Sequence, residues 1–112
     1  MVVQRVFVIW TNPLFHDSVR MILNHPDVEW VGSISDYTTA RDKILSLKPS
    51  VVIVEEVEGA NPALVFSILE WCNWNMRVIN LSLTDNKYYV YHRQQKIVGQ
   101  AEDLLRLIQG NL

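Results

Sequence analysis

Residues 51–55, with the sequence Val-Val-Ile-Val-Glu, constrain the fold more than any other stretch of the chain. Four consecutive β-branched residues follow closely on Pro49, with no polar residue among them. A strand with one wet face alternates polar and apolar side chains, whereas a strand buried on both faces does not. The run therefore predicts a central parallel strand covered by helices on two sides, and it ends in acidic residues at Glu55, Glu56 and Glu58.

The chain on either side alternates between strand-like and helix-like segments. Apolar runs at residues 5–10, 28–35 and 77–83 predict further strands. Segments with apolar residues at helical spacing lie between and after them, and Thr11 or Asn12 can cap the first helix ahead of Pro13. Asn61 and Pro62 are expected to start the third helix. Strands spaced by helices of this length predict βαβ units with right-handed crossovers.

Residues 81–98 break this alternation because they carry no helical stripe. Asp85 and Asn86 are typical of a tight turn between two strands. A parallel strand would need a connection of about a dozen residues, so we expect a β-hairpin in place of the fourth crossover helix. Its second arm is expected to be a sheet edge and a candidate homodimer interface, formed by Tyr88, Tyr89 and Tyr91.

The expected fold is thus a three-layer, doubly wound, mainly parallel five-stranded α/β sheet, as a single domain over residues 1–112.

Trp71 and Trp74 lie three residues apart on the third helix, whose apolar surface is already broad. We therefore expect one of these tryptophans to contribute to a protein interface.

Composition argues against several classes of function. The 112 residues have a net charge of −2, and their basic residues are scattered rather than clustered, so we expect no nucleic-acid partner. The single cysteine, Cys72, excludes an intramolecular disulfide and fits a cytoplasmic location. The apolar N-terminal run is too short for a membrane span, and His16, His25 and His92 lack metal-ligand spacing. We expect no metal, cofactor or membrane association.

Residues 6–56 resemble the receiver domain of two-component response regulators, in particular the subclass that usually precedes a helix-turn-helix output domain. The resemblance rests on NPLF at 12–15, HPDVEWVGSISD at 25–36 and LKPSVVIVE at 47–55, and it is looser in the second half. It implies a receiver, or flavodoxin-like, fold and a role in signal transduction. No output domain is expected after residue 112.

The resemblance also shows where this chain departs from the family. The acidic pair that holds Mg²⁺ in the family falls on Trp10 and Thr11, the phosphoacceptor aspartate on Glu55, the switch hydroxyl on Ser82 and the lysine on His92. Magnesium prefers hard oxygen ligands, and phosphoryl transfer depends on the charge that it supplies. We therefore expect a pseudo-receiver that does not accept phosphate, with Glu55 as a permanent anion and Ser82 donating a hydrogen bond to it.

Two functions from different classes remain open. The favoured one is a stand-alone, phosphorylation-independent adaptor that binds a signalling protein and is not an enzyme. The alternative is a small flavodoxin-like enzyme or ligand-binding domain that uses Glu55 and Glu56. The segment WTNPLF after the first strand contains no glycine, which argues against a nucleotide or flavin phosphate site. A plain structural interpretation, a solvated strand end with Ser82 in a structural role, also remains open.

Overall fold

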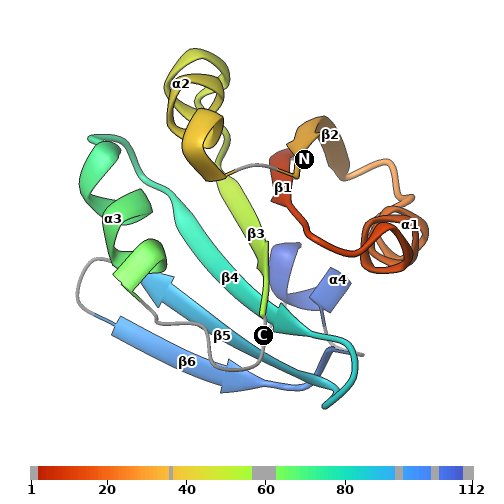
Figure 1. Ribbon diagram of the computed structural model, residues 1–112. Coiled ribbons are helices and arrows are strands. Elements are labelled where there is room, and N and C mark those ends of the chain that lie inside the picture. The colour runs from red at the N-terminus through yellow and green to blue at the C-terminus, as the bar shows by residue number, and fades with distance from the viewer. Residues whose placement is uncertain (1–2, 36, 57–62, 93–94, 102–103, 110–112) are drawn as a thin grey trace.

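The residue run at 51–55 forms the middle of a six-stranded sheet with the strand order β2-β1-β3-β4-β5-β6 (Figure 1). The computed structural model describes residues 3–35, 37–56, 63–92, 95–101 and 104–109. The expectations for Glu58, Asn61 and Pro62 lie outside these ranges. The strands are β1 (Gln4–Ile9), β2 (Val28–Ile34), β3 (Val51–Glu55), β4 (Arg77–Ser82), β5 (Lys87–His92) and β6 (Gln95–Gly99). The helices are α1 (Pro13–Ile22), α2 (Tyr37–Leu47), α3 (Ala63–Trp71) and α4 (Leu104–Ile108).

The layers follow from the two-sided burial of β3. Val51 and Ile53 belong to a core shared with α1 and α4, whereas Val52 and Val54 belong to a core shared with α2 and α3. All four side chains are at most 3% exposed. Figure 1 shows α1 and α4 on one face of the sheet and α2 and α3 on the other. Because β1, β2, β3 and β4 are parallel, the doubly wound α/β class is confirmed.

Of the two cap candidates in the sequence, Thr11 and Asn12, it is Asn12 that caps helix α1. Asn12 has an extended backbone, its side-chain oxygen accepts the N–H of Leu14 at 2.9 Å, and Pro13 occupies the first helical position. A cap of this kind satisfies a backbone donor that a helix end leaves without a partner. On the buried side, Phe15 and Val19 enter the core. The cap therefore fixes the point at which the chain leaves β1 and enters α1.

The predicted hairpin is also present. Strands β4 and β5 pair antiparallel, with Ser82 opposite Lys87 next to the turn. Asn86 has a φ of 53°, a left-handed conformation that asparagine tolerates better than most residues. The N–H of Asp85 donates to the Ser82 hydroxyl at 3.2 Å. Local turn chemistry thus replaces the fourth crossover helix.

The prediction that β5 is a sheet edge is wrong. Residues 95–99 form β6, a sixth strand that pairs antiparallel with all of β5, so the sheet has one strand more than expected and its edges are β2 and β6. Tyr88 and Tyr91 are only 3% and 7% exposed, and Tyr89 is half-buried. Tyr88 belongs to the core shared with α1 and α4, and Tyr91 to the core shared with α2 and α3, so these side chains are buried by the helix layers. No helix in the described ranges is long and apolar enough to cross a membrane.

Candidate functional site

The carboxyl ends of β1, β3 and β4 lie side by side at one end of the sheet, and Glu55 stands on the middle strand of the three, β3. Its Oε1 accepts hydrogen bonds from the backbone N–H of Thr11 at 2.8 Å and of Asn12 at 2.9 Å. These donors precede the first turn of α1, which has no acidic residue of its own. A carboxylate is stabilised there by the charge-assisted bonds and by the helix dipole. Glu55 therefore ties the end of β3 to the start of α1.

Trp10 and Thr11, which the resemblance places at the positions of the family's acidic pair, adjoin this carboxylate. Neither has a carboxylate of its own. Thr11 contributes its backbone N–H. Trp10 is half-buried, and its ring lies 5.2 Å from that of His16; the indole Nε1 is buried without a hydrogen-bond partner. Among the described residues, no group of three acidic, histidine or cysteine side chains is placed to hold a metal ion. The turn presents hydrogen-bond donors where a metal site would present carboxylates.

The expected hydrogen bond from Ser82 to Glu55 is not formed. The Ser82 hydroxyl accepts the N–H of Asp85 and lies 3.5 Å from an Asp85 carboxylate oxygen. That arrangement holds the β4–β5 turn, in keeping with the structural interpretation of Ser82. The residue is buried, with 7% exposure, and it still lines the same cleft as Glu55.

His92, which the resemblance assigned to the family's lysine position, lies at the opposite end of the sheet from Glu55, so the structure does not bring these two residues together. Because β5 runs antiparallel to β4, the strand starts near the site and ends away from it. Burial lowers the pKa of His92, and the nearby charge of Arg77, the first residue of β4, lowers it further. The basic residue that the hairpin brings opposite Ser82 is Lys87, which is exposed. Sequence reasoning missed Lys87, although the predicted hairpin itself implied the reversal.

Tyr37 is a second residue near the site that the sequence did not indicate. It starts α2, the helix that follows β2. Burial raises the pKa of Tyr37, and the negative charge of Glu55 raises it further. The Tyr37 phenol therefore lies close enough to the Glu55 carboxylate for an electrostatic interaction.

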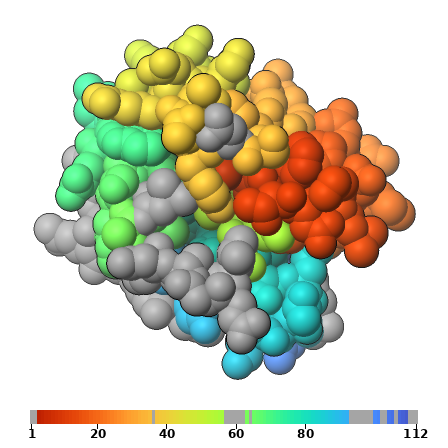
Figure 2. Space-filling model, viewed as in Figure 1, coloured from red at the N-terminus to blue at the C-terminus, as the bar shows by residue number. Residues whose placement is uncertain are grey.

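A cleft of about 270 Å³ opens beside Glu55, between the start of α1 and the β4–β5 turn. In Figure 2 the yellow-green end of β3 is visible in a hollow between the red start of α1 and the cyan β4–β5 segment. Glu56, the other candidate acid, also lines this cleft. The structure therefore brings Glu55, Glu56 and Ser82 together and leaves His92 out.

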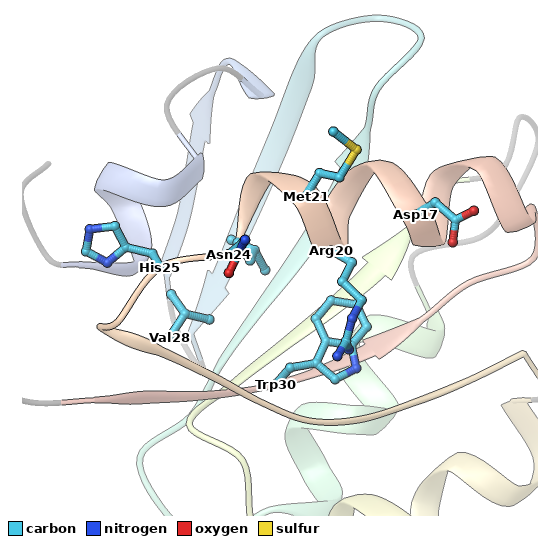
Figure 3. A pocket seen from close by; sticks show the side chains of 8 residues that line it. Asp17, Arg20, Met21, Asn24, His25, Val28 and Trp30 are labelled. Carbon is cyan, nitrogen blue, oxygen red and sulfur yellow. The ribbon is translucent and has the colours of Figure 1, made fainter.

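A second and larger hollow, of about 520 Å³, lies between α1 and β2 (Figure 3). The Arg20 guanidinium lies 4.8 Å from the centre of the Trp30 ring, and Trp30 meets His16 edge-on at 5.4 Å. The lining includes both Asp17 and Arg20. Because the charges are mixed and the indole is already covered by Arg20, this hollow indicates no particular ligand.

The two candidate interface tryptophans lie away from the site. Trp71 and Trp74 are half-buried and pack against the core under α2 and α3. Trp74 also donates its indole N–H to the carbonyl oxygen of Pro49 at 2.7 Å. That bond joins the segment after α3 to the segment before β3. Trp74 has a structural role in addition to any part in binding.

This geometry and topology define a receiver-like α/β domain. No protein-family model and no curated protein matches the chain. Among solved structures, it is similar to the signal receiver domain of NarL, a response regulator from Mycobacterium tuberculosis, with a TM-score of 0.61, 26% identity, and coverage of 73% of this chain and 68% of that one. A mutant of the anti-anti-sigma factor PhyR from Bartonella quintana gives a TM-score of 0.61 at 18% identity, over 72% of this chain and 34% of that one. The chain therefore has the fold of a receiver domain; at 18% identity, the second likeness concerns the fold alone.

Proposed function

We propose that this chain is a receiver-like signalling module that acts by binding protein partners and not by accepting a phosphoryl group. The observation that carries the proposal is the position of Glu55, whose Oε1 is held by the N–H groups of Thr11 and Asn12. A negative group is thus built into the site. Glu55 fixes the β1–α1 turn against β3 without any chemical modification.

The surrounding residues support phosphorylation independence. Transfer of a phosphoryl group needs cations that neutralise its developing charge. Positions 10 and 11 hold Trp10 and Thr11 instead of carboxylates that could recruit Mg²⁺. Both hydrogen bonds to Glu55 go to one oxygen, Oε1, and hold the side chain against the start of α1.

The adaptor proposal predicts no reaction with a small phosphodonor. We expect the wild-type protein to show no added phosphoryl group by intact mass spectrometry after incubation with acetyl phosphate and Mg²⁺. A matched control combines Trp10→Asp, Thr11→Asp and Glu55→Asp, which restores acidic residues at the three positions. A stoichiometric adduct on the wild-type protein, labile or stable in acid, would contradict the proposal.

Affinity purification from the native host then identifies the partner. Co-purification of a signalling protein is the expected result, whereas a co-purifying small molecule would favour the ligand-binding alternative. Glu55→Asp provides a comparison because it keeps the charge and shortens the side chain. We expect weaker recovery of the partner with this variant if the Glu55 contact shapes the binding surface.

A further inference from the structure

The charged side chains that line the cleft beside Glu55 are all negative. Two carboxylates, of Glu55 and Glu56, and three hydroxyl groups, of Ser18, Ser82 and Thr84, line a volume of about 270 Å³. No described lining residue is basic. A cleft with acceptors and negative charge, and without a cation of its own, is complementary to a positively charged group.

Both carboxylates have oxygens that accept no hydrogen bond from a described residue. The two bonds to Glu55 go to Oε1, and no described residue donates to its Oε2. The Glu56 backbone N–H donates to the carbonyl oxygen of Leu81 at 2.8 Å, but within the described ranges its carboxylate has neither an ion pair nor a hydrogen bond. Glu56 is nevertheless half-buried. A partly desolvated carboxylate is stabilised when a cation pairs with it.

Apolar side chains lie directly beside these acids. Leu14, on the first turn of α1, lines the cleft and is 70% exposed. Leu83, on the β4–β5 turn, is half-buried on another side of the cleft. The cleft thus combines an apolar rim with an anionic interior. A small metal ion would not pack against the apolar rim. A long basic side chain would, because it has an apolar stem as well as a charged head.

We propose that this cleft binds a lysine or arginine side chain presented by a protein partner. The stem packs against Leu14 and Leu83, and the cationic head lies between Glu55 Oε2 and the Glu56 carboxylate. The hydroxyl groups of Ser18 and Thr84 can accept further hydrogen bonds from the head. This inference rests on the proposed adaptor function and names the chemistry of the partner.

The test uses single amino-acid probes and the full chain. We expect N-acetyl-lysine methylamide or N-acetyl-arginine methylamide to cause saturable shifts of the Glu56 and Thr84 amide signals in ¹⁵N-resolved NMR spectra, with a Kd of about 1–10 mM for so small a ligand. N-acetyl-norleucine methylamide has a similar stem without charge and should cause no saturable shift. Stronger binding of the arginine probe would indicate a paired, planar contact with the two carboxylates, and stronger binding of the lysine probe a point charge.

Variants separate this site from general charge attraction. Glu56→Gln should weaken the binding of the basic probes about fivefold, as expected for a partly exposed ion pair. Glu70→Gln is the matched control, because Glu70 is an exposed acid on α3 outside the cleft, and it should leave binding unchanged. Equal weakening by both variants, equal binding of norleucine, or shifts that do not saturate would each overturn the proposal.

The experiments distinguish a failure of the cleft proposal from a failure of the adaptor proposal. A phosphoryl adduct on the wild-type protein would overturn the adaptor proposal whatever the probes do. If no adduct forms and the basic probes do not bind, the adaptor proposal stands and the cleft proposal is wrong. A titration with MgCl₂ alone completes the test, since saturable shifts of the same two amides at about 1 mM or below would assign the cleft to a metal ion instead.

Discussion

Glu55 shows how the length of one side chain decides its role. Its carboxylate bridges from the end of β3 to two N–H groups at the start of α1, at 2.8 and 2.9 Å. An aspartate would be shorter by one carbon–carbon bond, about 1.5 Å. Neighbouring Glu56 has no such contact among the described residues. Two adjacent acids therefore differ in their contacts with the start of α1.

Substitution of these two acids should give different losses of stability. We expect Glu55→Ala to lower the free energy of unfolding by about 1–2 kcal/mol, the range of hydrogen bonds to a charged group at a partly exposed helix start. Glu55→Asp should lose more than half of the unfolding free energy that Glu55→Ala loses, because the shorter side chain keeps the charge but does not extend to the two N–H groups. Glu56→Ala should stay within about 0.5 kcal/mol of the wild type.

Urea unfolding monitored by tryptophan fluorescence measures these differences. Full recovery of stability in Glu55→Asp would mean that charge alone matters and that the two hydrogen bonds contribute little. Equal losses for Glu55→Ala and Glu56→Ala would return both residues to the interpretation of a solvated strand end.

At the scale of elements, the β4–β5 hairpin rearranges the site. If β5 ran parallel to β4, His92 would lie at the same end of the sheet as Glu55. The antiparallel hairpin instead brings Lys87 opposite Ser82 and His92 toward Arg77. Arg77 also donates to the carbonyl oxygens of Leu107 and Ile108 near the end of α4. One tight turn therefore exchanges the residues at the two ends of the sheet.

The direction of β5 can be tested by the titration of His92. Burial and the Arg77 charge lower its pKa from the ordinary value of 6.5, whereas a position beside the Glu55 carboxylate would raise it. Because the pKa is lower in the folded state, the neutral ring contributes stability above pH 6.5, and that contribution is lost as pH falls through the lowered value. His92→Gln should therefore lose less stability than the wild type on acidification from about pH 7 to about pH 5.

NMR titration of the His92 ring gives the pKa directly, with His25 as an internal comparison. Arg77→Gln should raise the His92 pKa only in part, because burial is the larger cause and remains. A His92 pKa above 6.5 in the wild type would contradict the antiparallel arrangement.

At the scale of the whole molecule, the sheet has its edges at β2 and β6, with β5 enclosed. Tyr91 is 7% exposed and meets Phe66 of α3 edge-on, with ring centres 5.8 Å apart. Self-association by pairing of β-strands would have to use an unpaired edge. Tyr91 therefore packs within the fold of a single chain.

Tyr91→Lys should accordingly unfold the monomer rather than dissociate a dimer. We expect a loss of about 3 kcal/mol or more, because the change removes a packed ring and buries a charge. The loss should be the same at about 1 µM and about 100 µM protein, a range over which a weak dimer would respond. Met21→Lys, at a position that is 80% exposed, is the control and should change stability by less than about 0.5 kcal/mol. A concentration-dependent loss, together with a dimer in sedimentation equilibrium, would contradict this assignment.

The sequence by itself determined the features that depend on neighbouring residues. The uninterrupted run from Val51 to Val54 predicted a strand buried on both faces, since each face of an α/β sheet needs its own apolar residues. Asn12 and Pro13 predicted the start of α1, and Asp85 and Asn86 predicted the hairpin, because caps and turns are hydrogen-bonded within a few residues. Fold class, and the order of the first elements, followed from these local patterns.

Only the tertiary structure decided which groups meet at the site. Glu55 bonds to N–H groups 44 and 43 residues away, and a side chain at a strand end can reach several neighbours that sequence spacing does not distinguish. The strand at residues 95–99 became the sheet edge through pairing with β5, although its own sequence is polar at the start and short. The position of Lys87, the burial of Tyr91 and the anionic cleft all follow from those pairings, because the direction and neighbours of a strand are set by contacts between distant parts of the chain.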